Sequence, residues 1–298
     1  MLQVTRLLYP ALADNVASAA LTQAVHLAAA HGATLHVVPV EGDRAEVEAA
    51  VEAEQQGRQG TIPVEIHEAI ETDGEEALAQ ALQGLVDELG VDLVVLDAAP
   101  GHESAPPLAI ERTRCLVEHL DSSLLLVQEG GRPATIQRLL VPTDLSAQST
   151  KTLRHATELA SCYDASIVLL HVIDTSPYVA LTPVDRLSLG QTTLSEHRAR
   201  RHLRRAVKEG QLADVPIQIR VEFGTPGDQI SHVAAEEEVN LLALCAHGRD
   251  LHSERALGPV ATRVLRRVST SMLLTRPGAS LLPGDAEMSV AESAGDDG

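Results

Sequence analysis

The chain of 298 residues is aliphatic and acidic, with one phenylalanine, three tyrosines, no tryptophan and a formal net charge of −19. Aromatic platforms for stacking single-stranded nucleic acid are therefore nearly absent, and no apolar run is long enough to cross a membrane. The first 20 residues carry no signal-peptide pattern, and Cys115, Cys162 and Cys245 stand alone, so we expect a cytoplasmic protein without disulfides or a thiolate metal site.

The charge is unevenly divided between the two halves. Through Pro133 there are 22 acidic and six basic residues, a net charge of −16, whereas the remainder has 20 acidic and 17 basic residues, a net charge of −3. Five of the later acids follow Pro283, so the rest of the second half is neutral or slightly positive. An anionic ligand would be repelled by the first half and tolerated by the second.

Short apolar runs alternate with helical spacing along the chain and predict two similar series of elements. In the first half we expect strands at Leu7–Pro10, Thr34–Val40, Val64–Ala69, Val91–Asp97 and Ser123–Val127, with helices at Ala17–His31, Ala45–Gln56 and Glu75–Glu88 and one more before the last strand. In the second half we expect strands at Leu139–Pro142, Ser166–Ile173, Ile217–Glu222, Asn240–Ala246 and Ser271–Thr275, with helices at Ser149–Tyr163, Asp185–Glu209, Gly227–Glu238 and from Gly258 to about Val268.

The second series repeats the first at two fixed offsets. Leu7–Leu12 returns 132 positions later as Leu139–Asp144, and Val91–Leu96 returns 148 positions later as Val239–Leu244. The difference of 16 residues falls mostly around Thr175–Gly190. Two constant offsets indicate a duplicated domain.

Continuous apolar strands alternating with helices predict an α/β fold with a mainly parallel sheet covered on both faces. We expect two tandem five-stranded parallel sheets, packed as a pseudo-twofold pair through the edge strands Ser123–Val127 and Ser271–Thr275. The first domain is predicted at 1–130, a linker at 131–136, the second domain at 137–277 and a disordered acidic tail at 278–298.

Ligands in sheets of this kind bind beyond the carboxyl ends of the strands, where the strand order reverses. Asp144 lies at that end of the first strand of the second domain. The fourth strand of this domain leads into a loop and then a helix start, at His247-Gly248-Arg249 and Gly258-Pro259-Val260-Ala261. A glycine loop leading into a helix favours phosphate, because free backbone N–H groups and the helix dipole both attract anions.

Five segments of the second domain occur in an order typical of one known family: Val141-Pro142-Thr143-Asp144, Leu170-His171-Val172-Ile173, Gly224-Thr225-Pro226, His247-Gly248-Arg249 and Leu257-Gly258-Pro259-Val260-Ala261. This domain resembles the universal stress protein family. As a tandem pair the resemblance spans 4–129 and 136–277, and it is mainly architectural in the first copy. It implies an adenine nucleotide alpha hydrolase-like, Rossmann-like fold.

The resemblance also implies a ligand. The second domain would bind ATP or AMP, with Mg²⁺ only alongside ATP. Asp144 would hold the adenosine moiety, and the backbone of Val172 the adenine. The phosphates would lie against Gly248, Gly258, Val260 and Ala261, and the remaining candidate site residues are Pro142, Thr143, His247, Arg249 and Pro259.

The nucleotide pattern of the family is G-x-x-G, nine residues, then G-[S/T], and the second domain departs from it twice. Cys245 replaces the first glycine and adds a side chain where the backbone should approach the ligand. Pro259 replaces the Ser/Thr and removes a hydroxyl and an N–H from the phosphate site. A site that keeps only its shape is the alternative to nucleotide binding.

The first domain has lost the nucleotide pattern. Leu12 stands where Asp144 does, and Asp97, Pro100, Ile110 and Glu111 replace Cys245, Gly248, Gly258 and Pro259. Glu111 is expected at the N-terminus of a helix, where its carboxylate would occupy the place of a phosphate. We therefore expect no nucleotide in this domain.

No pattern predicts catalysis or a metal. The 13 histidines show no HExxH spacing and are expected to be scattered, and Cys245 beside His247 is expected to be a buried inert thiol. The basic run at Arg198–Arg205 is expected to be a solvated helix face with Leu203 pointing inward, and nucleic-acid binding is not expected.

Two functions remain open. One is a stress-response regulator, not an enzyme, that binds ATP or AMP through the second domain and has protein partners or self-associates as a dimer. The other is a scaffold that binds protein partners or a small apolar ligand without nucleotide.

Overall fold

The computed structural model describes residues 4–13, 15–56, 61–98, 106–128, 136–175, 189–209, 215–246, 257–268 and 270–276. The chain divides into two compact units. The first contains the chain up to Thr135 together with the last strand, and the second contains Ile136–His252 and Gly258–Thr270. The predicted linker at 131–136 lies outside the described residues except for its last position, and the predicted tail at 278–298 lies wholly outside them.

The first unit is an α/β sheet with the strand order β3-β2-β1-β4-β5-β10. Its elements are β1 (Arg6–Leu12), α1 (Ala19–His31), β2 (Thr34–Val40), α2 (Arg44–Gln55), β3 (Val64–Ile66), α3 (Glu75–Leu89), β4 (Leu93–Asp97), α4 (Pro106–His119), β5 (Ser123–Val127) and β10 (Ser271–Thr275). The first five strands are parallel, whereas β10 is antiparallel to β5.

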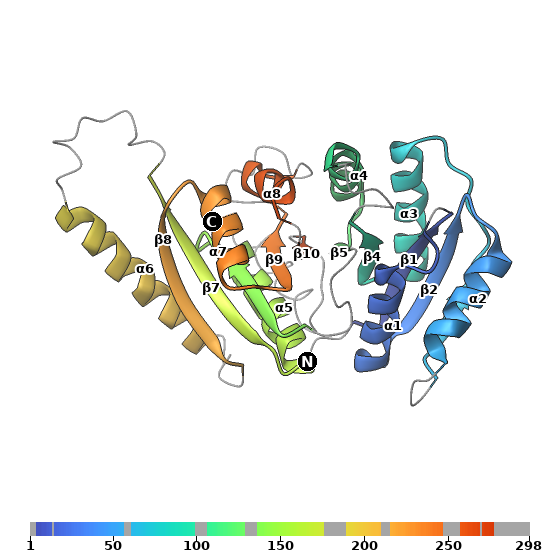
Figure 1. The fold of residues 1–298 in the computed structure, drawn as a ribbon, viewed down its shortest axis with the longest axis horizontal. Coiled ribbons are helices and arrows are strands. Elements are labelled where there is room, and N and C mark those ends of the chain that lie inside the picture. The colour runs from blue at the N-terminus through green and yellow to red at the C-terminus, as the bar shows by residue number, and fades with distance from the viewer. Residues whose placement is uncertain are drawn as a thin grey trace, which may run out of the picture. The chain divides into compact units, whose positions relative to one another are not determined.

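Helices cover both faces of this sheet, because each crossover between parallel strands carries its helix onto one side. Helix α1 packs against α2 and against the central strands, while α3 packs against α4 (Figure 1). The core lies between these layers and includes the fully buried side chains of Leu7, Leu21, Leu82 and Leu116. The Oγ of Ser18 caps α1 by accepting hydrogen bonds from the N–H groups of Ala20 and Leu21.

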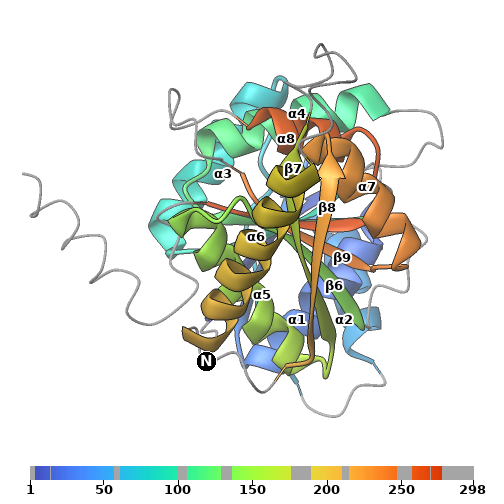
Figure 2. The same ribbon diagram turned by 90° about the vertical axis from the view of Figure 1, so that its left-hand side faces the viewer.

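The second unit repeats the arrangement with the strand order β9-β6-β7-β8. Its elements are β6 (Arg138–Pro142), α5 (Ala147–Cys162), β7 (Ser166–Asp174), α6 (Leu189–Glu209), β8 (Ile217–Gly224), α7 (Pro226–Glu236), β9 (Leu241–Cys245) and α8 (Pro259–Leu265). All the pairings among these four strands are parallel. Figure 2 shows α6 lying along β7 and β8, and α7 packs against α8.

One polar contact recurs in both units: a side chain just before one strand accepts hydrogen bonds from the backbone at the start of the neighbouring strand, β1 in the first unit and β6 in the second. Asp92, just before β4, accepts hydrogen bonds from the backbone N–H groups of Thr5 and Arg6 at 2.7 and 3.0 Å. At the equivalent place before β9, Asn240 accepts them from Gln137 and Arg138 at 3.1 and 3.0 Å. This tertiary contact therefore recurs at positions that the sequence offset predicts to be equivalent.

The predicted α/β fold is confirmed, with mainly parallel strands and helices on both sides. The predicted pairing of the edge strands Ser123–Val127 and Ser271–Thr275 is present, with Leu125 opposite Leu273. Because this pairing places β10 in the first unit, the described residues form six strands in the first unit and four in the second instead of five each. No helix in the described part of the chain has the length and apolar character needed to cross a membrane.

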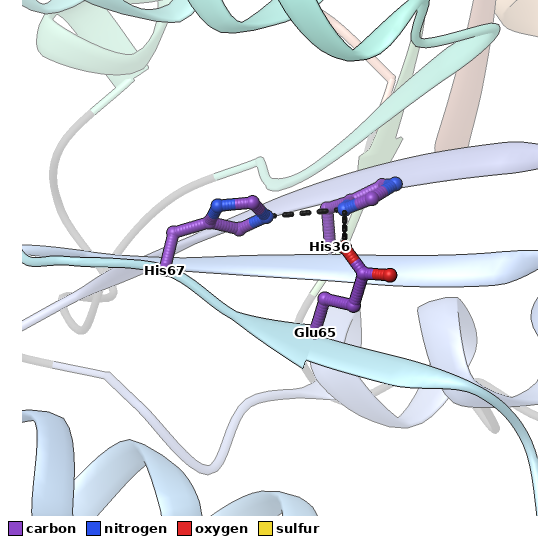
Figure 3. Close-up of side chains that lie close together, drawn as sticks. All are labelled: His36, Glu65 and His67. Carbon is purple, nitrogen blue, oxygen red and sulfur yellow. Dashed lines mark hydrogen bonds and ion pairs between the residues drawn. The ribbon is translucent and has the colours of Figure 1, made fainter.

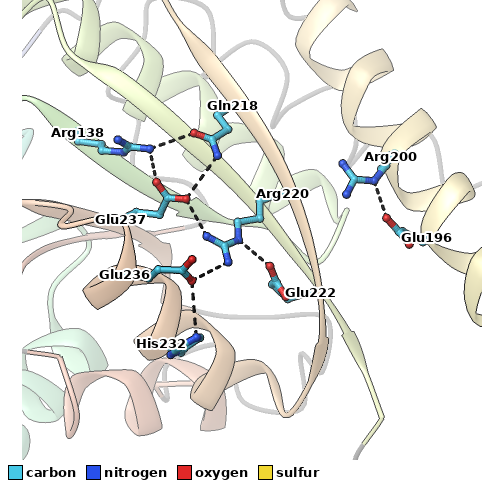
Figure 4. Close-up of polar contacts among 9 residues, drawn as sticks. All are labelled: Arg138, Glu196, Arg200, Gln218, Arg220, Glu222, His232, Glu236 and Glu237. Carbon is cyan, nitrogen blue, oxygen red and sulfur yellow. Dashed lines mark hydrogen bonds and ion pairs between the residues drawn. The ribbon is translucent and has the colours of Figure 1, made fainter.

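A polar network holds β8 to α7 in the second unit (Figure 4). Arg220 on β8 donates to Glu222 at 2.6 Å, to Glu236 at 2.7 Å and to Glu237 at 2.7 Å. Glu237 also accepts a hydrogen bond from Arg138 on β6. Hydrogen bonds from Arg220 to Glu222 and Glu236 raise the pKa of Arg220 above its usual value. The guanidinium therefore joins the strand and the helix through three carboxylates.

Candidate functional site

The turn after β6 holds Asp144 at the carboxyl end of the second unit's sheet. The Oδ1 of Asp144 accepts a hydrogen bond of 3.0 Å from the backbone N–H of Ser146. The preceding residue, Thr143, accepts one of 3.0 Å from the N–H of Leu145, and its hydroxyl lies 2.8 Å from that of Ser149. Hydrogen bonds of this kind fix a turn, so the half-buried carboxylate of Asp144 is held in a defined orientation.

The same turn carries backbone strain. Leu145 has a φ of 66°, in the left-handed region that residues other than glycine seldom adopt. His171 on β7 stabilises the turn from the neighbouring strand, because its Nδ1 lies 2.8 Å from the carbonyl oxygen of Thr143 and donates to it. Strain held in place by surrounding contacts is typical of binding sites.

Asp144 lies where the strand order reverses. Strand β6 pairs with β7 on one side and with β9 on the other, and the chain reaches these two neighbours through different crossovers. The strand order therefore reverses between β6 and β9, and their carboxyl ends mark the switch point at which doubly wound folds bind ligands.

Helix α8 begins beside the end of β9. The backbone N–H of Gly258 donates to the carbonyl oxygen of Ala246 at 3.0 Å, so this N–H is used within the protein. Pro259 is the first helical residue and has no N–H, and no side chain caps the helix. As at any helix start, the N–H groups of Val260 and Ala261 have no partner within the helix, so two such groups are offered to an anion, fewer than the family pattern implies.

The other predicted site residues are only partly described. Val172 lies on β7, half-buried, with Glu222 of β8 as its register partner. Pro142 is buried at the end of β6, and Cys245 is a half-buried thiol at the end of β9. His247, Gly248 and Arg249 lie outside the described residues.

The equivalent place in the first unit contains larger and more acidic side chains. Tyr9, at the position equivalent to Val141, is fully buried, and its hydroxyl lies 2.9 Å from that of Ser18. Asp97, at the position equivalent to Cys245, accepts a hydrogen bond of 3.4 Å from the N–H of Ala20. Burial, and then the nearby carboxylate of Asp97, raise the pKa of Tyr9. Leu12 supplies no carboxylate at the end of β1.

The expectation for Glu111 is wrong. Helix α4 begins at Pro106, a residue suited to the first helical turn, and Glu111 is five residues further on. Its carboxylate is exposed and accepts a hydrogen bond of 2.8 Å from Arg114. Glu111 therefore does not occupy the place of a phosphate at the helix start. Ile110 belongs to the same helix, and Pro100 lies outside the described residues.

Two histidines that were expected to be scattered lie together with a glutamate in the first unit (Figure 3). His36 on β2 has its Nδ1 3.1 Å from the Nε2 of His67 and 3.4 Å from the Oε2 of Glu65. These three residues could hold a metal ion. The sequence contains a signal, because Glu65 and His67 are two residues apart and share one face of a strand. The third member could not be assigned without the register of β2 against β3.

The basic run on α6 is a surface feature, as predicted. Arg198, Arg201 and Arg204 are exposed, while Leu203 is buried. Arg200 pairs with Glu196 one turn away at 2.8 Å. The basic face of α6 is therefore exposed to solvent, and the helix packs through its opposite, apolar side, which includes Leu203.

Comparison with known proteins identifies the second half of the chain. The sequence model of the universal stress protein family matches residues 135–276. A universal stress protein from Methanocaldococcus jannaschii is 26% identical over 140 residues, which are 47% of this chain and 82% of that protein. Another, from Methanothermobacter thermautotrophicus, is 23% identical over 141 residues, or 47% of this chain and 95% of that protein.

Solved structures extend the similarity of fold to nearly the whole chain. The chain resembles a functionally unknown protein from Pseudomonas aeruginosa with a TM-score of 0.70 and 19% identity, covering 98% of each chain. It resembles a universal stress protein from Archaeoglobus fulgidus with a TM-score of 0.61 and 13% identity, covering 93% of this chain and 98% of that one. Residues 135–276 of the chain are therefore a universal stress protein domain.

Proposed function

We propose that the protein is a stress-response regulator that binds one adenine nucleotide, ATP or AMP, in its second domain and none in its first. Membership of the universal stress protein family supports the stress-response role. The proposed domains are 1–130, without nucleotide, and 137–277, with the nucleotide site. The proposed role is binding without catalysis, in keeping with the similarity to universal stress proteins.

The observation that carries the proposal is the turn at Asp144. Its carboxylate lies at the switch point of the sheet and is oriented by the N–H of Ser146 at 3.0 Å. A fixed carboxylate at this place suits the neighbouring hydroxyl groups of a ribose, which a carboxylate can accept together. The strained φ of Leu145 and the hydrogen bond from His171 to Thr143 support a turn that is built to hold this geometry.

The phosphate part of the ligand would be held more weakly than the nucleoside. In the described start of α8, the N–H groups of Val260 and Ala261 could bind a phosphate, whereas Gly258 donates to Ala246 and Pro259 has no N–H. The adenosine moiety would therefore supply most of the affinity. We propose His247, Gly248 and Arg249 as further phosphate contacts from the sequence resemblance alone, and Mg²⁺ only together with ATP.

The first domain is proposed to bind no nucleotide. Leu12 has no carboxylate that could accept hydrogen bonds from a ribose. Tyr9 fills the interior of the unit at the end of β1, and Asp97 places a carboxylate at the end of β4. The net charge of −16 through Pro133 adds a repulsive field against any phosphate.

None of the three cysteines forms a disulfide. This supports a cytoplasmic location, since an oxidising compartment favours disulfides. Protein partners or self-association, including a dimer, are proposed on the family resemblance.

Calorimetric titration of the full chain with Mg-ATP, AMP and adenosine tests the proposal. Measurable binding of all three, lost together in Asp144→Asn, is the expected result. No heat of binding up to millimolar ATP would sink the proposal and favour a scaffold that works without nucleotide.

A further inference from the structure

The edge of the sheet in the first unit brings three metal-ligating side chains onto one face (Figure 3). His36 of β2 is the register partner of Glu65 of β3. His67 follows two residues after Glu65, so it returns to the same side of the strand. The parallel pairing of two strands thus positions three side chains that are up to 31 residues apart in sequence.

The distances between their polar atoms match those around one metal ion. Two ligand atoms bound tetrahedrally at 2.0–2.1 Å lie about 3.3 Å from each other. The Nδ1 of His36 lies 3.1 Å from the Nε2 of His67 and 3.4 Å from the Oε2 of Glu65. All three atoms lie within 4.8 Å of one another. The side chain of Glu65 is 63% exposed, so it can rotate to close the remaining edge.

Hydrogen bonds alone cannot pair all three groups of this cluster at once. One Nδ1 of His36 faces both an imidazole nitrogen and a carboxylate oxygen, and a neutral imidazole can donate its Nδ1 proton to only one of them. A metal ion at this point would contact all three groups at once.

The surroundings favour a cation. The first half of the chain carries a net charge of −16 through Pro133, which raises the local concentration of positive ions. The guanidinium of Arg6 is the nearby positive charge, and it is directed to the carbonyl oxygen of Leu89, to which it donates at 2.7 Å. Two imidazoles and one carboxylate are a ligand set that binds zinc and leaves a fourth position open.

We propose that His36, Glu65 and His67 form a binding site for one zinc-class divalent transition-metal ion, with a water molecule as the fourth ligand. The ion would join β2 to β3. Because β3 is a strand of three residues that pairs with β2 at the edge of the sheet, such a link would stabilise this edge. This site is separate from the proposed nucleotide site, which lies in the second unit.

The test uses the full chain, stripped of metal with a chelator and free of nucleotide, and titrated with zinc alone. Competition with a chromophoric chelator reports the affinity and the number of ions bound. Thermal unfolding with and without zinc reports whether binding stabilises the fold. We expect one zinc ion per chain and a higher Tm in its presence.

Two exposed or half-exposed ligands allow the site to be removed without disturbing the core. Glu65→Gln keeps the shape of the side chain, and His67→Ala truncates a half-buried ring after the strand. Each should weaken zinc binding by about tenfold or more and abolish the shift in Tm. The matched control is Glu68→Gln, at an exposed position outside the cluster, which should bind zinc like the natural chain.

Absence of zinc binding by the natural chain at micromolar concentrations would overturn the proposal. Equal binding by Glu65→Gln, His67→Ala and the control would also overturn it, since the ion would then be held by other histidines. Nucleotide titrations of the same variants should match the natural chain, so failure of this site and failure of the nucleotide site are distinguishable.

Discussion

The hydroxyl oxygens of Tyr9 and Ser18 lie 2.9 Å apart in the interior of the first unit. Ser18 is also the residue that caps α1, so one buried hydroxyl joins the central strand to the start of the helix. The second unit has the smaller Val141 in place of Tyr9, and its helix α5 is capped by Ser146 next to Asp144. The two repeats therefore use the same region differently, one for packing and the other for a polar turn.

Tyr9→Phe should lower the free energy of unfolding by about 1–2 kcal/mol at neutral pH, because the hydroxyl of Ser18 loses a buried partner. The effect should also depend on pH. The pKa of Tyr9 is raised in the folded state, so its contribution is fully present below the unfolded value of about 10 and is lost as the pH rises above it. Urea unfolding at pH 8 and pH 11 measures both effects.

The stability difference between the natural chain and Tyr9→Phe should shrink at the higher pH, since phenylalanine cannot ionise. A difference that stays constant or grows above pH 10 would show that Tyr9 is not held neutral by its surroundings.

Asp144→Asn should weaken the binding of ATP, AMP and adenosine alike, by about ten- to hundredfold, through loss of charge-assisted hydrogen bonds. Asparagine keeps an oxygen that can accept from the N–H of Ser146, so the turn and the stability of the unit should be preserved. Calorimetry gives the affinities and thermal unfolding gives the stability. A variant that binds like the natural chain would place the nucleoside elsewhere.

Leu12→Asp is the reciprocal variant and restores the missing carboxylate in the first unit. It should not create a second nucleotide site, because Tyr9 and Asp97 still occupy the surrounding space. Titration of this variant with ATP should give the same stoichiometry as the natural chain. A second bound nucleotide would show that Leu12 alone had closed the site.

Pro259→Ser should strengthen the binding of ATP and AMP by about five- to tenfold, since it returns an N–H and a hydroxyl to the start of α8. The affinity for adenosine should not change, because adenosine has no phosphate. Comparing the three ligands on the two proteins separates the phosphate contact from the nucleoside contact. An equal gain for adenosine would count against a phosphate at this helix.

Arg220→Ala should lower the free energy of unfolding by about 1–3 kcal/mol, because it leaves three carboxylates without their shared partner. The control is Arg200→Ala, which removes a single pair with Glu196 on one helix and should cost about 0.5 kcal/mol or less. Figure 4 shows both sets of contacts. Equal losses in the two variants, measured by urea unfolding, would show that the network adds no stability.

Most elements of the fold could be predicted from the sequence, because buried parallel strands are continuous apolar runs. Ser123–Val127 and Ser271–Thr275 agree with β5 and β10 residue by residue. The strand expected at Val64–Ala69 ends at Ile66, and the helix expected from Ala17 begins at Ala19. The end of β3 depends on its edge pairing with β2, a tertiary contact that local patterns do not specify. The start of α1 is set by the local cap at Ser18, a signal that the sequence contains.

The candidate site was less predictable than the fold. Asp144 could be found from its place after a buried strand, and the structure adds the strained turn that orients it. The sequence does not predict the start of α4 at Pro106. The offset of 148 residues places the helix start at Glu111, the position equivalent to Pro259, and α4 begins five residues earlier. The contact between His36 and His67 was also missed, since it depends on a register between strands that only the folded chain fixes.

The number of nucleotides bound per chain tests the central claim most directly, because it asks whether one repeat kept the site and the other lost it. Equilibrium titration of the full chain with ATP should reach one nucleotide per chain, and Asp144→Asn should reduce this to none at the same ligand concentrations. Two nucleotides per chain, or one nucleotide that remains in Asp144→Asn, would contradict the account.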